Sequence, residues 1–143
     1  MKNIFTIALI SVFTMGCSST TMSLNEKDNE YSQFVLNENL LSKDKINGFK
    51  FSGWRSLSDN YLIITAVHDK DYLIETNTEC SSLHTARSIQ INQTSSLAIY
   101  KDLDSISGGG KYAEKCFIKS IYPISGEQTD QLVSIGKTFE SES

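Results

Sequence analysis

Three cysteines and two histidines are the residues of this chain best suited to covalent or metal chemistry. A structural zinc ion takes four cysteine or histidine ligands, usually from two clustered pairs. The only suitable spacing here is Cys80-x-x-x-His84, and no second pair completes it. We therefore expect no metal and no cofactor.

Nucleophilic hydrolysis would need a serine or cysteine beside a base that a third group orients. Only His68 and His84 could serve as histidine bases, and His68 lies in a predicted turn among acidic residues. No G-x-S-x-G motif is present. The sequence therefore predicts no catalytic residues, and we expect a protein that is not an enzyme.

Two pairs of aspartates could in principle ligate calcium: Asp69 with Asp71, and Asp102 with Asp104. Neither pair is followed by the glycine and the distal glutamate of a calcium-binding loop. Aspartate also favours turns, because its side chain hydrogen-bonds the nearby backbone. We interpret both pairs as turn residues.

The first 16 residues have the layout of a secretory signal, with Lys2 followed by an apolar run over residues 4–13. The run holds about ten residues, whereas a helix that spans a bilayer needs about 20. Residues 1–16 are therefore predicted to be a signal peptide and not a transmembrane helix.

The pair Gly16-Cys17 resembles the cleavage site of bacterial lipoproteins, although Thr14 and Met15 depart from the usual pattern. The resemblance implies that Cys17 becomes the acylated N-terminus and holds the protein at a membrane. Ser18 after the cysteine implies sorting to the outer membrane, facing the periplasm. The alternative is ordinary cleavage after Ser18, which would discard Cys17 and release a soluble protein.

Once Cys17 is set aside, Cys80 and Cys116 are left as an even pair in an oxidising compartment. Such a pair predicts one disulfide.

The net charge excludes one class of partner. Removal of residues 1–16 leaves 127 residues, enough for one domain, with 12 basic and 17 acidic side chains and a formal charge of −5. No basic run interrupts the chain, so we expect no nucleic acid as a partner. The expected partners are the membrane, through the lipid anchor, and an unknown envelope protein or ligand.

Beyond the signal, we expect a flexible tether over residues 17–30, a β-rich domain over 31–137 and a disordered tail over 138–143. Turn residues at 58–60 and 68–71 predict two hairpins. Short helical segments are expected within 31–41, within 80–87, and from Thr129 or Asp130 to a stop at Gly136. Alternating or β-branched runs predict six strands, at 49–53, 62–67, 72–76, 89–91, 97–100 and 116–118.

This pattern predicts a mainly β fold: a small antiparallel sandwich or barrel with one or two short helices and one disulfide.

The order of residues from 46 to 121 resembles a family of small exported proteobacterial proteins known only as a domain of unknown function. The resemblance rests on Gly53-Trp54 in a first strand, followed by the pair Cys80 and Cys116 around the later strands. It implies an envelope location and a cysteine pair, and it implies no activity. We expect Trp54 to lie in the core.

We therefore expect a non-enzymatic binding or structural accessory of the envelope. An alternative is a periplasmic inhibitor of a lysozyme-like enzyme, because Ser105-Ile106-Ser107-Gly108 followed by Tyr112 faintly resembles a loop of such inhibitors.

The first prediction is that Cys17 is acylated, so that Cys17→Ser moves the protein from the membrane fraction to the soluble fraction. Mass spectrometry of the wild-type protein should find acyl chains on an N-terminal Cys17. An unmodified N-terminus at Ser19 would instead establish ordinary cleavage after Ser18.

Overall fold

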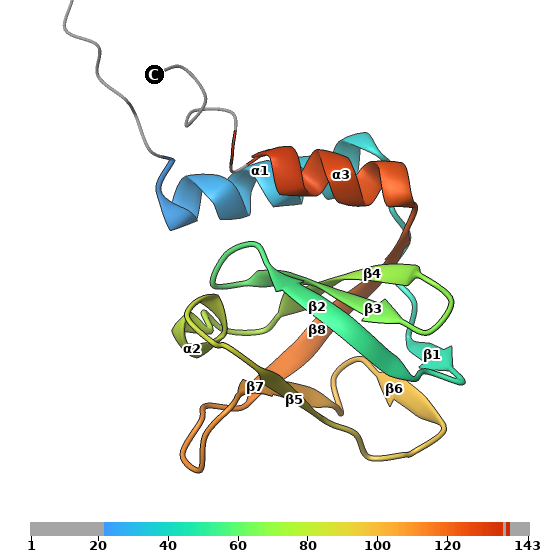
Figure 1. Ribbon diagram of the computed structural model, residues 1–143. Coiled ribbons are helices and arrows are strands. Elements are labelled where there is room, and N and C mark those ends of the chain that lie inside the picture. Colours follow the sequence, from blue (N-terminus) through green and yellow to red (C-terminus); the bar gives the residue numbers. More distant parts are fainter. Residues whose placement is uncertain (1–21, 136, 138–143) are drawn as a thin grey trace, which may run out of the picture.

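A computed structural model describes residues 22–135 and 137 of the chain (Figure 1). The signal peptide, Cys17 and the expected tail lie outside these residues. Within them the elements are α1 (Leu24–Asn37), β1 (Lys45–Asn47), β2 (Phe51–Ser56), β3 (Tyr61–Ala66), β4 (Lys70–Thr76), α2 (Ser81–His84), β5 (Ile89–Asn92), β6 (Ala98–Tyr100), β7 (Ser105–Gly108), β8 (Cys116–Ile124) and α3 (Gly126–Ile135).

Six strands form one antiparallel sheet in the order β2-β3-β4-β8-β7-β5, and β1 pairs with β6 in a small second sheet. The large sheet curls into a near-barrel (Figure 1). The expected mainly β fold is confirmed, and of the two architectures left open the barrel-like one holds. The described part of the chain has three helices, and each overlaps one of the three segments in which a short helix is expected.

The central strands are apolar on both faces, as their uninterrupted hydrophobic runs permit. Leu62 and Ile64 of β3 point into the main core, while Tyr61 and Ile63 point to the opposite face. The fully enclosed main core consists of Phe49, Leu62, Ile64, Ala66, Tyr72, Ile74, Cys80, Leu83, Ile99, Ile106, Cys116, Ile118 and Ile121.

Helices α1 and α3 lie side by side over the opposite face of the sheet (Figure 1). They remove its apolar side chains from water, which is the main favourable term in folding. We call this second cluster the helix-side core; its buried members are Tyr31, Leu57, Tyr61, Ile63, Leu73 and Leu132.

The expected tether is wrong for residues 24–30, which belong to α1. Ser23 and Glu26 form a capping box: the Ser23 hydroxyl accepts from the Glu26 N–H, and the Glu26 carboxylate accepts from the Ser23 N–H. Such a box satisfies two backbone donors that would otherwise lack partners. Tyr31, only 2% exposed, then holds the helix against the sheet. The folded domain therefore starts earlier than residue 31.

Helix α3 also begins earlier than expected. The Ser125 hydroxyl accepts from the Gln128 N–H, and the Gln128 side chain accepts from the Ser125 N–H. Thr129, one of the two expected caps, instead donates its hydroxyl to Asp71 on β4 at 2.7 Å. The expected stop at Gly136 lies outside the described residues.

The two expected hairpins are confirmed as β2–β3 and β3–β4, and α2 lies within the expected segment 80–87. Strands β1 and β7 were not expected. Trp54 therefore lies on the second strand and not the first, and it is partly buried against the main core.

None of the helices formed by residues 22–135 is long and apolar enough to cross a bilayer.

The disulfide between Cys80 and Cys116 is present. It joins the residue before α2 to the first residue of β8, with the two Cα atoms 6.1 Å apart and both cysteines fully buried. The bond thus ties α2 to the half of the sheet formed by β7 and β8.

A buried carboxylate holds the loop between β5 and β7. Asp104 is fully buried and accepts three hydrogen bonds, from the Thr94 N–H at 2.8 Å, the Thr94 hydroxyl at 2.8 Å and the Tyr100 N–H at 2.7 Å. A buried polar group is tolerated when its partners are supplied in this way. Asp104 is therefore a structural residue.

We predict that reducing the disulfide lowers the free energy of unfolding by about 3.5 to 4 kcal/mol, the chain-entropy value for a separation of 36 residues. Denaturant titration with and without reductant measures the change. The Cys80→Ser, Cys116→Ser variant should match the reduced protein and be insensitive to reductant. Equal stability of the oxidised and reduced wild type would contradict a stabilising bond.

We also predict that Asp104→Asn lowers the free energy of unfolding by more than about 2 kcal/mol, because an amide offers one acceptor oxygen to three donors. The matched control is Asp102→Asn, the same chemical change at an exposed position two residues away. It should cost no more than about 0.5 kcal/mol. Equal effects of the two substitutions in denaturant titration would overturn this assignment.

Candidate functional site

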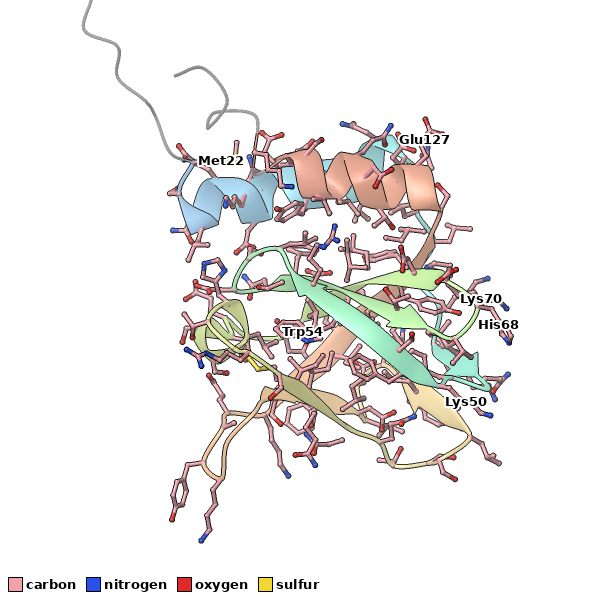
Figure 2. All side chains as sticks on the ribbon, viewed as in Figure 1. Met22, Lys50, Trp54, His68, Lys70 and Glu127 are labelled. Carbon is pink, nitrogen blue, oxygen red and sulfur yellow. A yellow bond between two sulfur atoms is a disulfide. The ribbon has the colours of Figure 1, made fainter. Side chains whose placement is uncertain are left out.

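A cleft of about 390 Å³ lies between the helix pair and strand β2. This volume falls within the range of about 300 to 1,000 Å³ of small-molecule sites. Figure 2 shows Met22 at one end of the helix pair and Glu127 at the other. The cleft is lined by residues from the first two turns of α1, the end of β2 and the end of α3. It therefore lies at the end of the helix pair that Met22 marks. Its lining residues are Lys27, Tyr31, Arg55, Ser56, Leu57, Val133 and Lys137.

Three cations from three separate segments converge on this cleft: Lys27 from α1, Arg55 from β2 and Lys137 just beyond α3. Among residues 22–135 and 137, no carboxylate lines the cleft. Within residues 22–135 and 137, none of the three cations forms an ion pair. A concentration of positive charge is unusual in a chain whose net charge is −4. The cleft is therefore electrostatically suited to an anion.

The cleft offers one hydroxyl donor, that of Tyr31. The buried Ser56 Oγ atom, which has no hydrogen-bond partner among the described residues, does not face the cleft, because Ser56 pairs with Leu62 and its side chain therefore lies on the main-core face of the sheet. The Tyr31 hydroxyl donates to the Leu57 carbonyl oxygen at 3.5 Å, which is long for a hydrogen bond. Burial, with a smaller contribution from Asp28, raises the pKa of Tyr31 to about 12, so the phenol stays protonated at neutral pH. The Tyr31 hydroxyl can therefore donate to a ligand in place of its long bond to Leu57.

The acidic residues next to Lys27 in the sequence have other partners. The Asp28 carboxylate accepts hydrogen bonds from the Ser58 hydroxyl and, at 2.8 Å, from the Asn60 side-chain amide. The Glu26 carboxylate closes the capping box at Ser23, and this bond lowers the pKa of Glu26. Neither carboxylate neutralises the cleft by pairing with its cations.

Neither histidine is among the residues that line this cleft. His68 is in the turn between β3 and β4, where it and Asp69 both have positive φ, as in type I′ turns. His84 ends α2. Within the part of the chain that the structure describes, no three histidine, cysteine, aspartate or glutamate side chains gather as a metal site would require.

The aspartate pairs also have structural roles. Asp71 accepts hydrogen bonds from Thr65 at 2.6 Å and from Thr129 at 2.7 Å, linking β4 to β3 and α3. Asp69 and Asp102 sit in turns with positive φ. Asp69 and Asp102 therefore shape turns, whereas Asp71 and the buried Asp104 accept hydrogen bonds that hold neighbouring segments together.

A second cleft, of about 620 Å³, lies between α2 and the β7–β8 loop. Its lining includes Arg87, Lys111, Tyr112, which is 91% exposed, and Ser82, whose buried Oγ has no partner in the structure. Ser105–Gly108 is a buried strand and not a loop. The residues that suggested an inhibitor are therefore enclosed, apart from Tyr112.

The cationic cleft was not foreseen from the sequence, because its three cations are separated by 28 and 82 positions. Lys27 falls within the polar stretch that predicts a tether. The one signal that could have placed it in the fold is the Ser23-x-x-Glu26 capping box.

Comparison with known proteins supplies a family and no activity. No curated protein and no solved structure matches the chain. The model of a family of unknown function, DUF6491, matches residues 1–137. Because that match covers nearly the whole sequence, the chain belongs to the family of unknown function DUF6491.

Proposed function

We propose that this protein is a non-enzymatic binding protein of the bacterial envelope, and that it captures an anionic ligand in the cleft between α1, α3 and β2. The observation that carries the proposal is the convergence of Lys27, Arg55 and Lys137 on one cleft, to whose lining the described part of the chain contributes no carboxylate.

The donors of the cleft suit a phosphate or carboxylate group. A guanidinium such as that of Arg55 can donate two parallel hydrogen bonds to either group, and lysine ammonium groups add mobile point charges. The Tyr31 hydroxyl offers a further donor, because its hydrogen bond to the Leu57 carbonyl oxygen is long, at 3.5 Å.

The lining of the cleft favours binding over catalysis. Its described lining residues include no histidine, no cysteine and no carboxylate. General acid–base catalysis at neutral pH usually relies on one of these side chains with a pKa near the working pH. The cleft can therefore hold and orient an anion, but its side chains offer no obvious base to move a proton.

The envelope location rests on residues 1–17, whose apolar run and Gly16-Cys17 pair are typical of an exported lipoprotein. The proposed site of action is the periplasmic side of the outer membrane, with Cys17 as the lipid attachment point.

The fourth prediction uses inorganic pyrophosphate as the probe, with the protein purified from cells that express the full chain. Titration calorimetry should detect binding to the wild type. Lys27→Gln with Arg55→Gln should weaken it by at least about 10-fold, because a hydrogen bond to a charged group contributes about 1.5 to 3 kcal/mol.

The matched control is Lys50→Gln with Lys70→Gln, which removes the same charge at the opposite end of the domain from Met22 (Figure 2). This variant should keep the wild-type affinity. If both double variants lose affinity equally, binding follows net charge and not the cleft. If pyrophosphate does not bind to the wild type, the proposed function fails.

A further inference from the structure

The cationic cleft lies at the end of the domain where the chain enters. Lys27 is four residues after the capping residue Ser23, and α3 returns to the same end, so that Lys137 lines the cleft beside Lys27. In Figure 2 this end is marked by Met22, while Glu127 marks the start of α3 at the other end.

The length of chain before α1 limits how far this end can be from a lipid attached to Cys17. Six residue steps separate Cys17 from Ser23. A fully extended chain covers at most about 3.3 to 3.6 Å per residue, or about 20 to 22 Å in all. A lipid at Cys17 would therefore hold the beginning of α1, and with it the cleft, near the head groups.

Charge favours one orientation of the domain at such a surface. The chain carries a net charge of −4, so an anionic membrane repels most of its surface. The three cations of the cleft converge where the chain enters the domain, and basic groups close to an anionic leaflet are attracted within about a Debye length of 8 to 10 Å. Attraction is strongest when the cleft faces the lipid.

We propose that the cleft binds the phosphate group of an anionic membrane lipid and thereby docks the domain on the surface that carries its anchor. Arg55 donates to two oxygens of the phosphate, and Lys27 and Lys137 neutralise its charge. This proposal rests on the proposed function, because it names the ligand of the same cleft. The shared chemistry is a phosphate oxyanion, and the source is the lipid head group.

The test uses the protein purified from membranes and reconstituted into phosphatidylcholine vesicles with or without phosphatidylglycerol. Amide hydrogen exchange is followed for residues 24–31 and 53–58, which border the cleft, and for residues 66–72, which do not. We expect exchange at the cleft segments to slow several-fold when phosphatidylglycerol is present, while exchange at 66–72 stays unchanged. Lys27→Gln with Arg55→Gln should abolish the protection, and Lys50→Gln with Lys70→Gln should keep it.

A third arm adds pyrophosphate to the phosphatidylcholine vesicles and separates the two proposals. Protection by pyrophosphate without protection by phosphatidylglycerol would overturn the lipid as ligand and leave the anion-binding function standing. Protection by neither would overturn both. A protein without a lipid on Cys17 that stays free of both kinds of vesicle would also overturn the docking proposal.

Discussion

The structure depends on a sheet whose central strands are apolar on both faces. Residues of β3 alternate between the main core, through Leu62 and Ile64, and the helix-side core, through Tyr61 and Ile63. Curling of the sheet encloses the first face but leaves the second exposed to water. The sheet is therefore stable only when its second face is also covered, and α1 and α3 cover it.

The position of the cleft follows from that cover. Tyr31 packs against Tyr61 with ring centroids 5.7 Å apart, and the Asp28 carboxylate ties α1 to the turn between β2 and β3. These contacts bring the first turns of α1 over the end of β2, where Lys27 and Arg55 line the same cleft. The cations are thus placed by the packing of an apolar layer, and the same packing directs α1 toward the expected anchor.

Much of the sheet could be predicted from local pattern, because turn residues between β-branched runs specify the β2–β3 and β3–β4 hairpins directly. Strand β7 could not be predicted in this way, because Ser105-Ile106-Ser107-Gly108 has only one apolar side chain. Its two serines are buried where β7 pairs with β5, and the Asn92 side-chain amide donates to both hydroxyls. Sequence pattern indicates only the second half of α1, because the polar residues 24–30 have the composition of a tether. The cleft could not be predicted from the sequence, because its cations meet only through tertiary packing. The disulfide could be predicted, because Cys80 and Cys116 are the two cysteines left once Cys17 is set aside.

The most direct test of the account is where an anion binds, which backbone amide chemical shifts of the isotope-labelled protein report residue by residue. Titration with water-soluble dihexanoyl phosphatidylglycerol should shift the amides of Lys27, Tyr31, Ser56 and Val133 in a saturable way, and dihexanoyl phosphatidylcholine should shift them far less. Saturable shifts confined to the α2 cleft around Arg87 and Lys111, or no saturable shift at any amide, would contradict the account.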